Sequence, residues 1–459
     1  MTTQKYTQIV EYLKSIIANT IWENHVFTVG GCVRDQVMNR EIKDIDLVVD
    51  LFSGGIRFAN WLNNNGYCYG PVVTYENFGT AMFHLKEFPD IELEVVQTRS
   101  ECYHDAKSRN PETSFGTIKQ DWERRDFTIN AMYYDISNDK LIDFENRGVN
   151  DVKNGVIRTC GEPDIIFVQD PLRQLRMCRF SSRLGFKISQ ETFDSAKRNI
   201  DRLEIISKER INDEFTKMIT YSNESIINSL CLLWDLGAFK YIIPDLNNIS
   251  VKNMFTILTS IKKMLAQPID YFKFLDNLKI PREIPVLTKL LYFAGIISNN
   301  DDEQYYRNIL KELKYSNEIS DYVCFLLKEN KKIEEFSYNN PFNDSNLHII
   351  RKIMNECGCY EKFYLSTIIG DDNISNEFHS FVTAPMSFFM EIIKEDSWAF
   401  DYKLPVDGNY IMEYFNIPPS KQVKEILRKT LNFVFINPDQ RDKDNVLNFL
   451  KYLKKTDYA

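Results

Sequence analysis

Residues 28–50, TVGGCVRDQVMNREIKDIDLVVD, decide the fold of the N-terminal part of this chain. They begin inside a short apolar run, residues 26–29, whose β-branched and aromatic residues predict a buried strand. Gly30 and Gly31 follow, where the backbone must turn sharply or let a ligand approach closely. A helix beginning at Cys32 would direct its free N–H groups toward this turn, and helix ends of this kind bind phosphate.

Two carboxylates one residue apart follow the turn. Asp44 and Asp46 lie in a second apolar run, and residues i and i+2 of a strand share a face. Two such oxygen ligands suit Mg²⁺, and paired metal ions can activate an attacking hydroxyl and stabilise a leaving phosphate. Arg34, in the first turn of the helix, adds a guanidinium that can donate two hydrogen bonds to a phosphate. Glu94 is either a third carboxylate of the site or a solvent-facing strand residue. The pattern predicts a nucleoside triphosphate site beside a metal site.

Composition limits the class of protein. The chain has 459 residues, enough for two or three domains, and no apolar stretch approaches the roughly 20 residues of a membrane span. Nine cysteines without a CxxC pair, and an N-terminus without a secretory or transit pattern, favour a cytoplasmic protein with reduced thiols. The net charge of −9 is unusual for a nucleic-acid binder, but RNA responds to local patches. One basic patch comprises Arg173, Arg176, Arg179, Arg183 and Lys187.

The distribution of glycine and of hydrophobic periodicity divides the chain. Twelve of the seventeen glycines precede residue 190, and that part alternates predicted strands with predicted helices. Further strands are predicted at residues 81–85, 91–96 and 132–135, and helices at residues 6–18 and 55–64. From Asp170 onward nearly every segment has helical periodicity. We predict an α+β protein with an α/β head containing a mixed sheet (1–160), a helical neck (161–225) and a helical body and tail (226–459).

Several ordered motifs resemble one family. GGCVRD followed by KDIDLVV resembles the first motif of the class II tRNA nucleotidyltransferases and their bacterial poly(A) polymerase relatives. RRDFTINAM (124–132) resembles the second motif, DPLRQLRMCRF (170–180) the nucleotide-selecting helix, and SKERINDEF (207–215) a later neck motif. The segment beginning LPVDGNYIMEYF at residue 404 resembles the bacterial tail. The resemblance implies a nucleotidyltransferase-type head, ATP and CTP as substrates, Mg²⁺ in a two-metal mechanism and tRNA as the partner.

The second motif supplies a cluster of charged and polar residues. Asn130 lies four residues after Asp126, so the two could share a helical face. The resemblance implies that an arginine of the pair Arg124 and Arg125 contacts the nucleotide; we favour Arg125, and Arg124 remains open. Without the resemblance, the cluster would fit the salt-bridged start of a helix.

The nucleotide-selecting helix predicts which bases are accepted. Asp170 and Arg173 are three residues apart, which makes them neighbours on one helix face. A carboxylate accepts and a guanidinium donates, so the pair matches the amino donor and ring-nitrogen acceptor of C and A but not G or U. Arg176 and Arg179 continue the spiral toward triphosphate or RNA, whereas Arg183 fits a surface ion pair. The family often has Glu before this Asp; here it is Gln169.

Two longer segments complete the prediction. Residues 99–123 are polar and poor in periodicity, and the resemblance implies a flexible loop that helps the site switch from C to A, with Arg99, Arg109 and Asp121 as candidate contacts. Some bacterial relatives carry a metal phosphohydrolase module with a His-Asp step. Residues 289–295 read KLLYFAG at that place, so we expect a helical remnant without hydrolase activity.

These features predict template-independent addition of CMP and AMP to the 3′ end of tRNA, with release of pyrophosphate. A poly(A) polymerase, or an enzyme adding only CC or only A, is the alternative within the family. An inactive RNA-binding protein on the same scaffold is the alternative from another class. Both carboxylates and the Asp170–Arg173 pair argue against the inactive scaffold.

Overall fold

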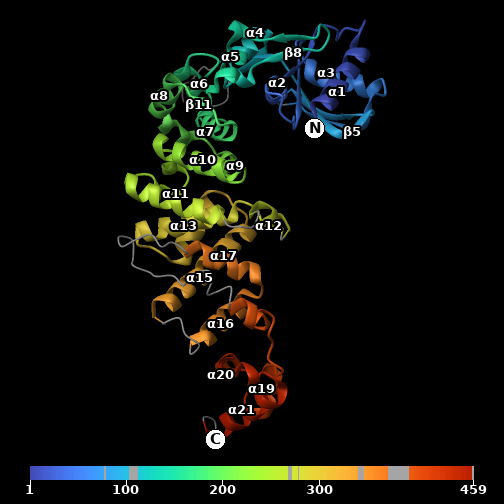
Figure 1. The fold of residues 1–459 in the computed structure, drawn as a ribbon. Coiled ribbons are helices and arrows are strands. Elements are labelled where there is room, and N and C mark those ends of the chain that lie inside the picture. The colour runs from blue at the N-terminus through green and yellow to red at the C-terminus, as the bar shows by residue number, and fades with distance from the viewer. Residues whose placement is uncertain are drawn as a thin grey trace. The chain divides into compact units, whose positions relative to one another are not determined.

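The computed structural model describes residues 1–76, 79–102, 112–266, 271–277, 279–339, 346–370 and 392–456. The chain divides into two compact units, Met1–Asn247 and Asn248–Ala459 (Figure 1). The boundaries predicted after residues 160 and 225 both fall inside the first unit and remain predictions.

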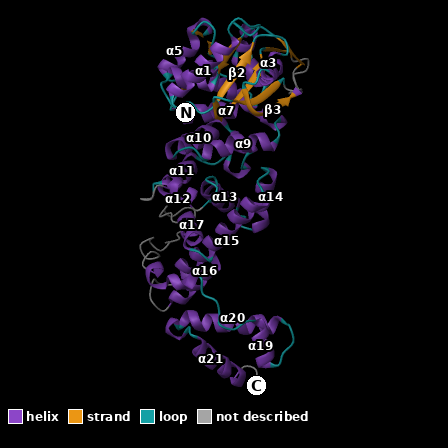
Figure 2. Ribbon diagram, turned by 90° about the vertical axis from the view of Figure 1, so that its right-hand side faces the viewer, coloured by secondary structure: helices purple, strands orange, loops and turns teal. Residues whose placement is uncertain are grey.

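A mixed seven-stranded sheet forms the centre of the head (orange in Figure 2). Its order is β3 (Cys68–Tyr75), β4 (Thr80–Leu85), β5 (Phe88–Gln97), β2 (Ile45–Val49), β1 (Val26–Val29), β8 (Tyr133–Asp135) and β9 (Lys140–Ile142). β2 and β5 pair in parallel, and the other neighbours pair antiparallel. All residues of β1 are buried, as the apolar run predicted. The predicted strands therefore meet in one sheet, and the predicted α+β fold is confirmed.

The head contains the helices that the sequence predicted, at residues 6–18, after the glycine turn and at residues 55–64, and two further helices, at residues 118–123 and 147–154, that it did not. They are α1 (Thr3–Ile17), α2 (Gly31–Val37), α3 (Gly54–Asn64), α4 (Ile118–Glu123) and α5 (Arg147–Asn154). α1 buries Tyr6, Ile9, Leu13 and Ile17, spaced by three or four residues on one face. The Tyr6 hydroxyl lies 2.7 Å from Thr28 Oγ1, so α1 is joined to the central strand β1 by a buried hydrogen bond.

The segment 99–123 is more regular than predicted. β6 (Arg99–Cys102) pairs with β7 (Glu112–Phe115), and α4 begins at Thr117 with a capping box formed with Gln120. The expectation of an irregular loop is wrong at both ends, because the backbone pairing and the cap stabilise structure that side-chain periodicity does not reveal. Arg109 lies outside the described residues.

The rest of the first unit is mainly helical. α6 (Pro163–Gln169), α7 (Leu172–Leu184), α8 (Gln190–Arg198), α9 (Lys208–Ile219) and α10 (Asn223–Leu236) follow the head, and a short parallel pair joins β10 (Val156–Ile157) to β11 (Lys187–Ile188). The first unit therefore contains both the sheet and the segment predicted to select nucleotides.

The assigned elements of the second unit are all helical. The α-helices are α11 (Val251–Leu265), α12 (Tyr271–Asn277), α13 (Ile284–Ser298), α14 (Glu303–Glu312), α15 (Asn317–Asn339), α16 (Leu347–Cys357), α17 (Tyr360–Gly370), α19 (Gly408–Phe415), α20 (Lys421–Ile436) and α21 (Lys443–Thr456). The segment KLLYFAG lies in α13, where the fully buried Lys289 donates to the carbonyl oxygen of Ile368 at 3.3 Å. In the described part of the chain, every helix is too short or too polar to span a membrane.

Candidate active site

A glycine turn joins β1 to α2 at the edge of the site. Gly30 has φ +81°, a conformation that residues with a side chain rarely adopt, and α2 begins at the next residue. A Cβ atom at Gly30 would lie 3.5 Å from Asp46 Oδ2. The turn therefore lies against the Asp46 carboxylate, and the Gly30 N–H donates to the carbonyl oxygen of Met132 at 3.4 Å. The helix begins one residue earlier than predicted, at Gly31.

The two predicted carboxylates line one cavity. Asp46 lies in β2, and Asp44 comes directly before that strand. A cavity of about 610 Å³ is lined by these two residues together with Met1, Lys5, Lys43, Ile45, Met82, Asp90, Ile91, Glu92 and Glu94. Glu94 on β5 is the cross-strand partner of Asp46. Five carboxylates against two lysines and the N-terminal residue make the cavity acidic.

The pKa of Asp46 is raised by burial and by the neighbouring carboxylates. Burial, followed by the Glu94 carboxylate, raises the pKa of Asp46 to about 6, and Arg125 opposes the rise. Burial also raises the pKa of Glu94. Carboxylates that repel one another at this spacing suit a divalent cation, which would offset their charge. Among the described residues, no group of three or more His, Cys, Asp or Glu side chains is arranged as a metal centre.

Arg34 and Asn130 meet in the site although they are far apart in the chain. Arg34 is 5% exposed; its Nε donates to Asp35 Oδ1 at 2.8 Å and its Nη1 to Asn130 Oδ1 at 2.6 Å. Its guanidinium lies 5.7 Å from the centre of the Phe180 ring on α7. Arg34 therefore holds the glycine turn, the second motif and the neck together.

Asp121 anchors both arginines of the second motif. It is fully buried and accepts from Arg124 Nη2 at 2.5 Å, Arg125 Nε at 2.9 Å and the Tyr133 hydroxyl at 2.7 Å. Burial alone would raise its pKa, but Arg125 and Arg124 hold it at about 2. Asp121 therefore positions the two arginines. Because it is fully buried, the expectation that it contacts a ligand is wrong. The positive charge of Arg125 also lowers the pKa of Asp46, although Arg125 itself does not line the acidic cavity.

Asp126 and Asn130 do not share a helical face, so that expectation is wrong. Phe127 between them is extended and forms an isolated β-bridge with Thr159; only Thr128–Asn130 makes a short 3-10 turn. Asp126 instead accepts from Arg176 of α7 at 2.9 and 2.7 Å, and this pairing holds the pKa of Asp126 low despite its burial.

The nucleotide-selecting pair also departs from prediction. Asp170 is extended, with φ −137°, because it precedes Pro171, and α7 begins only at Leu172. Asp170 Oδ2 accepts from Arg210 at 3.1 Å. Arg173 is 8% exposed and donates to the carbonyl oxygens of Ile166 at 3.1 Å and Arg124 at 2.7 Å. Asp170 therefore lies outside the helix that carries Arg173, and the two side chains do not share a helix face.

Glu214 and Phe180 are site residues that the sequence did not single out. Glu214 on α9 is 3% exposed and accepts from Arg179 Nε at 2.6 Å. Phe180 packs against the guanidinium groups of Arg34, Arg176 and Arg179 at 5.7, 5.3 and 4.3 Å. The available signal for Glu214 was a carboxylate on the apolar face of its helix, beside Ile211, Phe215 and Met218.

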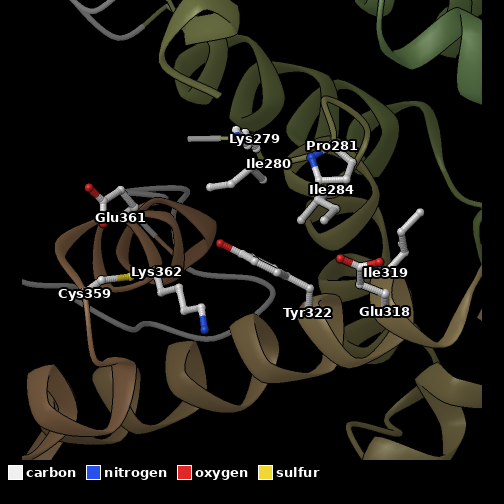
Figure 3. A pocket seen from close by; sticks show the side chains of 10 residues that line it. All are labelled: Lys279, Ile280, Pro281, Ile284, Glu318, Ile319, Tyr322, Cys359, Glu361 and Lys362. Atoms are coloured by element: carbon white, nitrogen blue, oxygen red, sulfur yellow. The ribbon is translucent and has the colours of Figure 1, made fainter. Parts of the chain in front are cut away.

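A second cavity, of about 240 Å³, lies in the second unit. Its lining comes from the loop before α13 and from α13, α15 and α17 (Figure 3). Figure 3 shows Tyr322 extending from α15 toward the centre of the cavity, and burial raises the pKa of Tyr322 to about 12. The Lys362 ammonium lies 5.6 Å from its ring. The two acids of this second cavity, Glu318 and Glu361, come from different helices. The first cavity has Asp44 and Asp46 close together in the chain, with Gly30 next to Asp46, and it is therefore the candidate active site.

Comparison with known proteins identifies the family to which the chain belongs. Residues 26–158 match the model of the poly A polymerase head domain, and residues 185–250 match the model described as the probable RNA and SrmB-binding site of polymerase A. The tRNA nucleotidyltransferase cca1 of Schizosaccharomyces pombe is 25% identical over 94% of this chain and 91% of its own length. The CCA-adding enzyme of Staphylococcus aureus is 30% identical over 68% of this chain and 70% of its own length.

The solved structures give the same fold. The crystal structure of the Bacillus stearothermophilus CCA-adding enzyme in complex with CTP matches with a TM-score of 0.68 and 21% identity, and covers 99% of both chains. The family models, the relatives and the solved structures all identify the same family and fold. The chain therefore belongs to the family of class II tRNA nucleotidyltransferases and poly(A) polymerases, including that family's RNA-binding domain.

Proposed function

We propose that this protein adds CMP, CMP and AMP in turn to the 3′ end of tRNA, using CTP and ATP and no nucleic-acid template. The observation that carries the proposal is the acidic cavity, where Asp44, Asp46 and the Gly30 turn meet. Relatives named as tRNA nucleotidyltransferase and CCA-adding enzyme, over most of the chain, support the choice of substrate. A cytoplasmic location is part of the proposal, and cell fractionation tests it.

The chemical step is a displacement at phosphorus. The 3′ hydroxyl of the tRNA attacks the α-phosphorus of the incoming nucleotide; the new O–P bond forms as the bond to the β-phosphate breaks, and pyrophosphate leaves. Asp44 and Asp46 would hold Mg²⁺ in a two-metal arrangement, which supplies activation of the hydroxyl and neutralises the leaving group. The backbone N–H group of Gly31 would bind the triphosphate together with Arg34 or Arg125, whereas the Gly30 N–H already donates to the carbonyl oxygen of Met132.

The arginines have graded roles in this proposal. Arg124 and Arg125 are both held by Asp121, and the charge of Arg125 lowers the pKa of Asp46, so Arg125 remains the favoured nucleotide contact. Arg176 and Arg179 are bound to Asp126 and Glu214, so they would reach triphosphate only by exchanging these partners. Asn130 orients Arg34 through its side-chain oxygen.

Base selection by Asp170 and Arg173 requires a rearrangement. Arg173 now donates to two backbone carbonyls, and Asp170 accepts from Arg210. We infer that an incoming C or A takes over part of these hydrogen bonds, because its pairing edge offers both a donor and an acceptor. G and U would leave buried polar groups unpaired, at a cost of about 1–3 kcal/mol for each. In this proposal the hydrogen bonds of Arg173 and Asp170 differ between the empty and the nucleotide-bound pocket.

The experiment is product analysis at nucleotide resolution. Purified protein is incubated with tRNA ending at the discriminator base, with CTP and ATP together and separately, and the products are sequenced. The proposal expects C, C, A and then arrest. Long A tails would indicate a poly(A) polymerase, arrest after CC or efficient A addition without CC a partial enzyme, and absence of incorporation an inactive scaffold. An Asp44→Ala, Asp46→Ala double variant controls for contaminating activity.

A further inference from the structure

Tyr221 presents an exposed aromatic ring to two cations from different parts of the first unit. It follows α9, and its side chain is 42% exposed. The Lys43 ammonium lies 5.7 Å from the centre of its ring, and the guanidinium carbon of Arg183 on α7 lies 4.8 Å from it. Both distances are within the range in which a ring face attracts a cation. The cluster therefore joins the segment before β2 to the neck.

Lys43 and Arg183 lie next to the Tyr221 ring with no carboxylate at ion-pair distance in the described residues, although Lys43 also lines the acidic cavity. Neither side chain forms an ion pair there, so the surface ion pair expected for Arg183 is absent from that part of the chain. The other three arginines of the predicted basic patch all have partners. Arg176 and Arg179 pair with acids, and Arg173 donates to backbone carbonyls. Positive charge free to meet a phosphate is therefore available at Tyr221.

This cluster borders the acidic cavity. Lys43 lines the cavity and immediately precedes Asp44, so the two Cα atoms are about 3.8 Å apart. Lys43 is the member of the cluster that lines the cavity, so an RNA strand lying along the cluster would bring its 3′ end beside the carboxylates. An exposed ring flanked by cations provides what single-stranded RNA binds, namely a stacking surface for a base and charges for the phosphates beside it.

We propose that Tyr221, with Lys43 and Arg183, binds the 3′-terminal nucleotides of the RNA that is being extended. The proposal rests on the proposed function and adds a binding site for its second substrate. Stacking accepts any base, because every base has a flat face. That property fits an RNA end whose last base changes from the discriminator to C with each addition.

The test separates RNA binding from nucleotide binding. We would measure kcat, KM for tRNA lacking CCA and KM for CTP in the wild type, Tyr221→Ala and Tyr221→Phe. Loss of one stacking ring should raise KM for tRNA on the order of tenfold in Tyr221→Ala, with KM for CTP unchanged. Tyr221→Phe keeps the ring and should behave as wild type. Tyr69→Ala is the matched control, because Tyr69 is 59% exposed on the edge strand β3.

Direct binding of the same tRNA without nucleotides, by fluorescence anisotropy, keeps this inference separate from the proposed function. Weaker binding by Tyr221→Ala than by Tyr69→Ala supports the site even if incorporation fails in every variant. Unchanged RNA affinity and KM in Tyr221→Ala would overturn it, as would a fall in kcat alone, which indicates that Tyr221 only orients the Asp44 segment. If Tyr221→Ala does not fold, Tyr221→Leu preserves the bulk without the ring.

Discussion

Replacing Asp121 by Asn tests whether this buried carboxylate orients the second motif. Asp121 Oδ1 accepts from Arg124, and Oδ2 accepts from Arg125 and the Tyr133 hydroxyl. In Asp121→Asn an amide NH₂ replaces one oxygen, so donors would face donors, and the buried arginines would lose their counter-charge. Breaking a buried ion pair in this way costs about 3–5 kcal/mol.

The pKa of Asp121 gives an independent magnitude. It is about 2 instead of the ordinary 3.8, and each unit corresponds to about 1.4 kcal/mol, so ionisation contributes about 2.5 kcal/mol. Because the folded-state pKa is lowered, this stability is present above pH 4 and is lost as the pH falls toward 2. The destabilisation of Asp121→Asn should therefore be largest near neutral pH and should shrink in acid.

The assay is urea unfolding followed by tryptophan fluorescence, with KM for CTP measured in parallel. Trp122 adjoins Asp121 and reports the transition of the head. Asp235→Asn is the control, because Asp235 is 57% exposed in its pair with Lys197 and should cost less than about 1 kcal/mol. If Asp121→Asn stays within about 1 kcal/mol of wild type with an unchanged KM for CTP, Asp121 does not hold the arginines.

Further predictions concern catalysis and selection. Asp44→Asn and Asp46→Asn should each abolish incorporation while tRNA affinity stays within about twofold; normal turnover in either would refute the metal-site assignment. Because the pKa of Asp46 is raised to about 6, incorporation should increase as the pH rises through 6, whereas this group's contribution to stability is lost over the same rise. Without divalent metal at pH 8, Asp46→Asn should therefore melt at a higher temperature than wild type. Arg173→Ala should weaken discrimination against U and G by roughly tenfold or more in four-nucleotide competition; an unchanged preference would remove its role in base reading. Deletion of residues 103–111 should preserve C addition and impair the final A, which gel analysis of the products would show.

Local patterns were sufficient for the elements around the carboxylates. The sequence predicted β1, the turn at Gly30 and β2, because strand burial and a positive φ depend on neighbouring residues. The same holds for the helical periodicity after Asp170. For Asp170, a local rule predicts the observed extended conformation, since the residue before proline avoids the helix, and this rule conflicts with the helical spacing to Arg173.

The partners of the charged side chains were beyond the reach of the sequence. The 65 acidic and 56 basic residues allow very many pairings, and spacing limits only those within one element. Arg176 meets Asp126, 50 residues earlier, and Arg179 meets Glu214, 35 residues later. The pairing of Asp46 with Glu94 depends on β5 lying parallel to β2 in the sheet.

By itself, the sequence determined that the chain has an α/β head with two metal-suited carboxylates and a helical remainder, because these properties arise from periodicity and from residue chemistry within short segments. Only the tertiary structure decided which cations are neutralised and which remain available. Packing of α7 against α9 and the head pairs Arg176 and Arg179 with carboxylates. Lys43 and Arg183 instead lie against the exposed ring of Tyr221. The charge that RNA can meet is set by which elements pack together, and that is a property of the folded chain.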